Sequence, residues 1–117
     1  MRVLTLLFLI LFIINVSGQD LSESDNQLFF AIQAMNYARA ASAIKNGANV
    51  SGVDEDGWPF FITAVSSGNQ KMINLFLNNR VNVNVKGPDG RTAIMHALSN
   101  GNIKMAENLL RRGAKIV

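Results

Sequence analysis

The feature that most constrains the fold is an internal repeat with a period of 33 residues. Gly57 and Gly90 are one period apart, and so are Gly68 and Gly101, without a gap in the register. Self-similarity at this spacing is typical of solenoids, in which each unit buries its apolar face only against its neighbours. The sequence therefore predicts three stacked units, at about residues 24–53, 54–86 and 87–117. Other pairs that keep the spacing are Asp56 and Asp89, Ala64 and Ala97, Asn69 and Asn102, Met72 and Met105, and Leu77 and Leu110.

Each unit is predicted to contain two short helices joined by a tight corner. In the second unit Pro59 precedes apolar residues at helical spacing, and proline is well tolerated in the first turn of a helix. Gly68 follows them, and a glycine at this place ends a helix by adopting the left-handed conformation. A second helix with a broad apolar face follows at 72–77. Between units, residues 81–85 alternate apolar and polar before a stretch rich in turn formers, 87–90, which predicts an extended hairpin.

Three segments of the last unit carry a resemblance to a known family. These are Gly90–Leu98, Gly101–Asn102 and Leu109–Ala114. They resemble the ankyrin repeat, whose pattern is glycine, any residue, Thr-Pro-Leu-His, then alanine, glycine, paired leucines and Gly-Ala. Leu28–Val50 looks like the form that the family uses for a first repeat. The resemblance covers about residues 24–117 and implies an all-α ankyrin-repeat solenoid of three helix-turn-helix units with short hairpin loops.

The chain departs from the family pattern at four positions. Ala93 replaces the proline, Met95 replaces the usual histidine, and Pro59 comes one place early. Arg80 stands where glycine is expected, aligned with Gly47 and Gly113. If the repeat register is right, the segments around residues 47, 80 and 113 should have like environments.

The first 18 residues are predicted to be a signal peptide. Met1-Arg2 supplies a positive start, an apolar run at 3–14 is too short to span a membrane, and small residues before Gln19 suit cleavage. We therefore expect residues 19–117 to form one ankyrin-repeat domain in a secreted or periplasmic protein. The alternative is an uncleaved anchor, which would make the chain a membrane-tethered structural protein. Because the chain has no cysteine, disulfides and thiolate chemistry are excluded.

The sequence offers no catalytic constellation, so we expect no enzyme, no cofactor and no metal. His96 is the only histidine, and its place beside the family's tetrapeptide favours a structural role. The acidic run 54–57 lacks the loop length of a calcium site and is interpreted as a solvated hairpin tip.

Charge is unevenly distributed along the chain. Residues 20–57 hold six acidic and two basic residues, a net of −4, whereas residues 58–117 hold eight basic and two acidic residues, a net of +6. An exported chain whose basic residues are not interleaved with aromatic ones is a poor match for nucleic acid. An acidic protein surface or an anionic envelope polymer fits the basic end, and the alternative is a solvated cap without a partner.

The resemblance implies that a partner protein binds at the hairpin tips and on the concave face formed by the first helices. We expect a monomer that meets no membrane once the signal peptide is cleaved. Trp58 is the first candidate for a binding hot spot, and the alternative is that its ring packs within the hairpin. The candidate partner-binding residues are Val53, Glu55, Asp56, Trp58, Ser66, Ser67, Lys86, Asp89, Arg91, Ser99 and Asn100, with Pro88 at the second tip.

The remaining large apolar residues are assigned to the core, and the last unit is predicted to close the stack. The phenylalanines assigned to the core are Phe29, Phe30, Phe60, Phe61 and Phe76. Where the second unit has Ile73 and Leu75, the third has Ala106 and Asn108, which suggests a polar face turned to solvent. Glu107 and Arg111 are spaced to pair on that face.

Overall fold

The computed structural model describes residues 22–116, and the predicted signal peptide at 1–18 lies outside that range. Within the described part the chain forms six helices, and its β-structure is limited to isolated bridges. The helices are α2 (Glu23–Gln33), α3 (Tyr37–Lys45), α4 (Phe60–Ser67), α5 (Gln70–Asn78), α6 (Ala93–Ser99) and α7 (Ile103–Arg111). The predicted all-α architecture of three helical pairs is confirmed.

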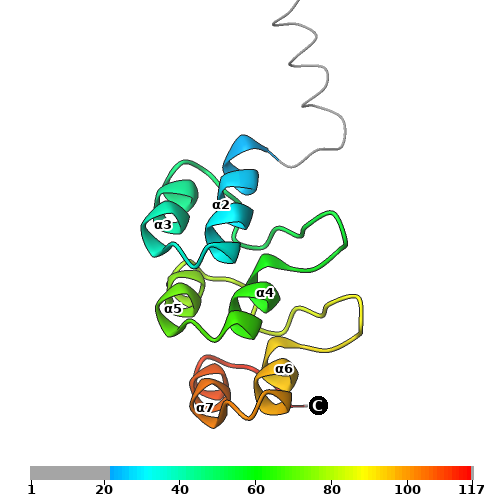
Figure 1. Cartoon of the computed structure of the whole chain (residues 1–117). Coiled ribbons are helices and arrows are strands. Elements are labelled where there is room, and N and C mark those ends of the chain that lie inside the picture. Colours follow the sequence, from blue (N-terminus) through cyan, green and yellow to red (C-terminus); the bar gives the residue numbers. More distant parts are fainter. Residues whose placement is uncertain (1–21, 117) are drawn as a thin grey trace, which may run out of the picture.

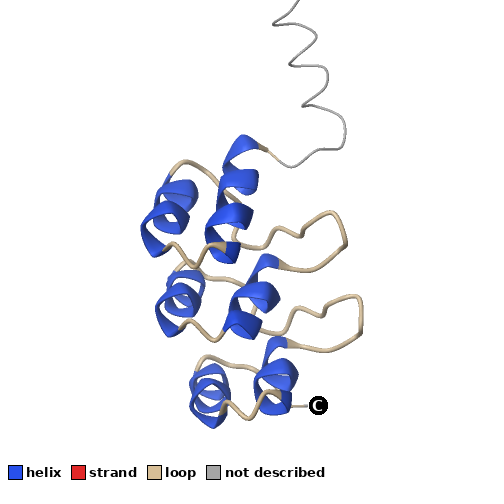
Figure 2. Cartoon of the chain, in the orientation of Figure 1, coloured by secondary structure: helices blue, strands red, loops and turns tan. Residues whose placement is uncertain are grey.

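The helices are arranged in two layers (Figure 1). The first helices of the units, α2, α4 and α6, stack in one column, and α3, α5 and α7 stack in the other. The loops that connect the units project from the side of the first column (Figure 2). Two such loops, at 52–59 and 85–92, therefore lie side by side along one edge of the stack.

The same local devices begin and end the helices in each unit. Asparagine caps all three second helices: the side chains of Asn36, Asn69 and Asn102 accept hydrogen bonds of 3.0–3.1 Å from backbone N–H groups in the first turn. The corner between the two helices contains a left-handed residue in each unit, namely Met35, Gly68 and Gly101. A second left-handed residue follows each second helix, namely Gly47, Arg80 and Gly113. The like environments predicted for the last three positions are confirmed.

The core runs through the middle of the stack between the two helix columns. Phe60, Phe61 and Phe76 are its largest fully buried side chains, and the rings of Phe61 and Phe76 lie 6.1 Å apart. Phe29 packs against this core from the first unit. Phe30 does not, because its side chain is 64% exposed, so its assignment to the core is wrong.

The alternation of apolar and polar residues at 81–85 suggested an extended strand, but this segment does not form one. The backbone N–H of Val85 bonds to the carbonyl of Asn82, which closes a turn at residues 83–84. The three valines at 81, 83 and 85 face or pack against the core, and this accounts for the alternating pattern without a strand. The hairpin proper is narrow, with single bridges between Val53 and Pro59 and between Lys86 and Thr92.

The predicted polar outer face of the last unit is also wrong. Ala106 is 3% exposed, and the amide of Asn108 donates to Asn74 Oδ1 at 3.4 Å, so both residues face the preceding unit. The outer face instead carries Leu98, Leu110 and Ile116. Among residues 22–116, Glu107 and Arg111 form no ion pair within 4.0 Å.

The uncovered positions of the last unit are identified by their counterparts one period earlier. Leu98 is 41% exposed and its counterpart Val65 2%, while Leu110 is 44% exposed and its counterpart Leu77 7%. The face of the first unit is different. Gln27 and Arg39 are exposed polar residues at the positions of the buried Phe60 and Met72. The two ends of the stack are therefore chemically unlike.

Candidate binding surface

The two hairpin tips are ordered by aspartate side chains that bond to their own backbone. Asp54 Oδ1 accepts hydrogen bonds of 2.9 Å from the N–H groups of Asp56 and Trp58. Asp89 Oδ1 accepts one of 3.1 Å from the N–H of Arg91. Such aspartate turns are self-contained, so each tip has a defined conformation without a bound partner. The acidic run at 54–57 thus uses Asp54 to build the turn.

Trp58 lies between the two hairpins and is only partly exposed. Its indole packs over Gly87, where an added Cβ would lie 2.7 Å from Trp58 Cζ3. Its ring also meets the edge of His96, with ring centroids 5.8 Å apart. The ring is therefore packed, as the alternative expected, but the surface that it meets is the neighbouring hairpin and helix α6 rather than its own hairpin.

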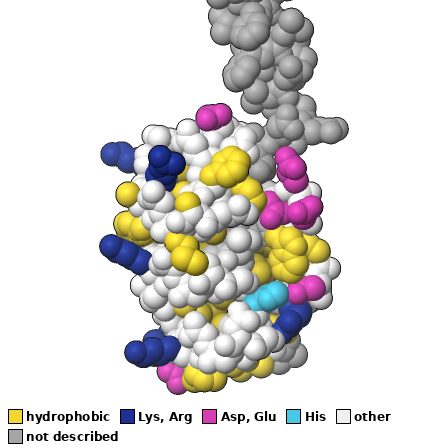
Figure 3. Space-filling model, in the orientation of Figure 1, with side chains coloured by type: hydrophobic (Ala, Val, Ile, Leu, Met, Phe, Trp, Pro, Cys, Tyr) yellow, Lys and Arg dark blue, Asp and Glu magenta, His cyan; other side chains and the backbone are white. Residues whose placement is uncertain are grey.

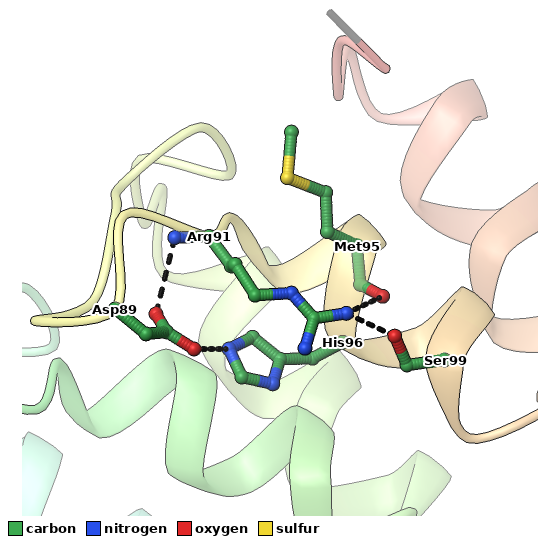
Figure 4. Close-up of polar contacts among 5 residues, drawn as sticks. All are labelled: Asp89, Arg91, Met95, His96 and Ser99. Atoms are coloured by element: carbon green, nitrogen blue, oxygen red, sulfur yellow. Dashed lines mark hydrogen bonds and ion pairs between the residues drawn. The ribbon is translucent and has the colours of Figure 1, made fainter.

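A polar network holds the second tip against helix α6 (Figure 4). The guanidinium of Arg91 donates to the carbonyl of Met95 at 3.2 Å and to the hydroxyl of Ser99. His96 Nε2 lies 3.2 Å from Asp89 Oδ2. Asp89, Arg91 and Ser99, three of the predicted binding residues, are thus brought together as parts of the framework.

The other predicted binding residues divide into exposed and engaged groups. Ser67 donates to the carbonyl of Ala64 at 2.6 Å, which engages its hydroxyl within α4. Those whose side chains are exposed are Val53, Glu55, Asp56, Ser66, Lys86, Pro88 and Asn100. The exposed group extends along the hairpin edge and the ends of the first helices, where the sequence resemblance placed the binding surface.

Two hollows flank Phe30, a surface residue that the sequence interpretation missed. One, of about 240 Å³, is lined by Asn26, Phe29, Phe30, Asp54, Glu55 and Asp56. The other, of about 440 Å³, is lined by Gln27, Phe30, Ala31, Ala34, Arg39 and Ser42. A signal for Phe30 was present in the repeat register, because its counterparts Thr63 and His96 are not core residues.

The charges are separated across the stack as well as along it. In Figure 3 the Lys and Arg side chains lie mainly on the side of α3, α5 and α7, and the Asp and Glu side chains mainly on the side of the hairpins. Within residues 22–116, no group of three or more His, Cys, Asp and Glu residues is placed to hold a metal ion. No helix in this part of the chain has the length and apolarity needed to cross a membrane.

A family comparison agrees with this arrangement of helices and loops. The model for ankyrin repeats in three copies matches residues 28–117. The chain belongs to the ankyrin-repeat family. Ankyrin repeats are protein-interaction modules and are generally non-catalytic. The hairpin tips and the first helices are therefore the candidate surface for contact with another protein. No curated protein matches this ankyrin chain.

Proposed function

We propose that the protein is an exported, non-enzymatic ankyrin module that holds one partner protein against its hairpin tips and first helices. The observation that carries the proposal is a set of exposed side chains on an ordered framework. The exposed side chains are those of Phe30, Val53 and Lys86. They lie along the edge of the stack where the aspartate turns and the hydrogen bonds of Arg91 hold the hairpins in place without a partner. Because these loops are ordered before binding, little conformational entropy is lost when a partner docks.

Affinity capture with a tip variant tests the binding surface. The double variant Val53→Ser plus Lys86→Gln should lose a partner that the parent chain captures from an extract of its own compartment. Both side chains are exposed, so the fold should be unaffected. Leu110→Ser plus Lys104→Gln is the matched control, since it replaces an exposed apolar residue by serine and an exposed lysine by glutamine on α7. Equal loss in both variants, or in neither, would contradict the assignment of the surface.

Trp58 and Arg91 are less informative positions for such a test. The Trp58 ring packs on Gly87 and His96, and Arg91 bonds to Met95 and Ser99. Substitution of either residue would disturb the framework together with any contact to a partner.

Within this proposal the partner is an exported enzyme that the module inhibits or protects. A small rigid surface of this kind is suited to cover an active-site cleft. The captured partner should change its activity, or its resistance to proteolysis, when the module is added in equal amounts. A partner with unchanged activity and protease resistance would favour scaffolding.

Export is proposed from residues 1–18, which lie outside the described range. Mass spectrometry of the protein isolated from its natural cells should find an N-terminus near Gln19. A chain that starts at Met1 and fractionates with membranes would favour the tethered structural protein instead.

A further inference from the structure

The acidic hollow at the first hairpin has the chemistry to bind a positively charged side chain. Two aromatic rings, Phe29 and Phe30, contribute to its lining, and their centroids are 5.6 Å apart in an edge-to-face arrangement. Three carboxylates from the hairpin tip, those of Asp54, Glu55 and Asp56, line the same hollow, and no basic residue of the described part of the chain does. Aromatic faces and carboxylates both attract cations, so the two kinds of group favour the same ligand.

The exposed ring of Phe30 distinguishes this hollow from an ordinary solvated tip. A phenylalanine that is 64% exposed loses contact with water on binding, and this favours an apolar stem next to the charge. The other exposed aromatic ring of the first unit, Tyr37, already has Lys71 Nζ 4.9 Å from its centroid. No Lys or Arg side chain of residues 22–116 lies over the ring of Phe30 in this way. A lysine or arginine from another molecule would supply it.

The second hollow extends this surface on the other side of the same ring. It is lined by the apolar side chains of Phe30, Ala31 and Ala34 together with Gln27, Arg39 and Ser42. A segment of another protein that placed a cationic residue in the acidic hollow would bring an adjacent side chain over Phe30, towards Ala31 and Ala34. An acidic side chain would not fit the acidic hollow, because the carboxylates that line it would repel it.

We propose that the two hollows around Phe30 bind an exposed segment of the partner protein in which an arginine or lysine adjoins an apolar residue. The cationic group lies against Phe29, Phe30 and the carboxylates of Glu55 and Asp56, and the apolar residue covers Phe30, Ala31 and Ala34. This proposal rests on the proposed binding function and specifies the chemistry of the partner.

The test uses a blocked six-residue peptide with a central Leu-Arg pair between Gly and Ser residues, titrated into isotope-labelled protein as it is isolated. Amide shifts in the NMR spectrum should be confined to residues near 26–34 and 53–57. Replacing the arginine of the peptide by glutamine should weaken binding at least fivefold, and replacing it by glutamate should abolish it. Raising the salt concentration from 50 to 500 mM should also weaken binding severalfold, because exposed charges are then screened.

Matched variants locate the site on the protein. Phe30→Ala and the double variant Glu55→Gln plus Asp56→Asn should each weaken the Leu-Arg peptide at least fivefold. Leu98→Ala, another exposed apolar residue, and Glu107→Gln, an exposed acid at the far end, should leave the affinity within twofold. Circular dichroism checks that every variant retains its helical content.

Three results would overturn this proposal. They are absence of binding at 5 mM peptide, equal affinity for the arginine and glutamine peptides, and shifts centred away from Phe30. If the protein instead self-associates through Arg111, Arg112 or Lys115, and the Phe30 variant prevents it, the occupant is a second copy and not a partner protein. Specific capture that depends on Val53 and Lys86, with no peptide binding, would leave the proposed function standing and remove only this inference.

Discussion

At the scale of single residues, two positions adopt left-handed backbone conformations that glycine adopts elsewhere in the stack. Met35 has φ 53° and Arg80 has φ 63°, where the equivalent positions in other repeats include Gly68, Gly101 and Gly47. A side chain in this region meets steric strain that glycine avoids. Both side chains are exposed, so few contacts compensate for the strain.

We therefore predict that Arg80→Gly stabilises the protein by about 1 kcal/mol, which raises the thermal midpoint by about 4–8 °C for a domain of this size. Thermal unfolding followed by circular dichroism measures the change. Arg80→Ala is the control, because it removes the same side chain but keeps the strained Cβ. Equal stabilisation by both variants would show that the arginine side chain, and not the backbone, is responsible.

The buried hydroxyl of Thr92 is a second local feature that lowers the stability of the fold. Thr92 is 4% exposed, and its Oγ1 has no hydrogen-bond partner among residues 22–116. Thr92→Val keeps the shape and removes an unsatisfied polar group, so it should stabilise the protein by about 1 kcal/mol in urea unfolding. Thr63→Val is the comparison, since Thr63 Oγ1 has an acceptor in the carbonyl of Pro59. Destabilisation by Thr92→Val as large as that by Thr63→Val would contradict this account.

At the scale of elements, Asn84 connects two successive repeats. Its amide donates to the carbonyl of Gly113 at 3.3 Å, and its Oδ1 accepts from the N–H of Lys115 at 2.8 Å. Removing both bonds should cost about 1–2 kcal/mol and release the segment after α7.

Hydrogen exchange at the Lys115 amide measures the local effect of Asn84→Ala, and protection there should fall. Asn82→Ala should have a smaller effect at Lys115, because Asn82 Oδ1 accepts only from the N–H of Asn84 in its own loop. Unchanged protection at Lys115 in Asn84→Ala would show that this contact does not hold the repeats together.

The repeat register predicted the elements well, because caps and corners recur with the same period as the residues that make them. Gly68 and Gly101 end first helices, and Asn69 and Asn102 begin second helices, wherever the period places them. The register failed where surroundings differ between repeats. His96 stands two periods after Phe30, and it packs against the Trp58 ring of the preceding hairpin. In the part of the chain that the structure describes, no such ring precedes Phe30, and Phe30 is exposed.

The exposure of the candidate binding residues could be predicted only in part, for a related reason. Sequence position locates a residue on a hairpin but does not show which side chains bond to one another across hairpins. Arg91 was expected to be available to a partner, and for Trp58 both an exposed and a packed ring were left open. Arg91 bonds to α6, and the Trp58 ring packs on Gly87. Ala106 and Asn108 were assigned to the outer face, although Ala106 is buried and Asn108 bonds to Asn74 of the preceding repeat.

At the scale of the whole molecule, burial depends on whether a repeat has a neighbour on each side. Leu77→Ala should therefore cost about 2–3 kcal/mol, whereas Leu110→Ala should cost less than about 1 kcal/mol, although the two leucines are one period apart. Urea unfolding of the two variants gives the comparison. Equal costs would show that the outer face of α7 is covered in solution.

The unlike ends of the stack also bear on how such an array is lengthened in the laboratory. An extra unit grafted after Ile116 would bury the exposed apolar side chains of Leu98, Leu110 and Ile116. A unit grafted before Glu23 would instead contact the exposed polar side chains of Gln27 and Arg39. Elongation by engineering should therefore succeed in one direction, towards the carboxyl end, and the surface around Phe30 would be left uncovered for recognition.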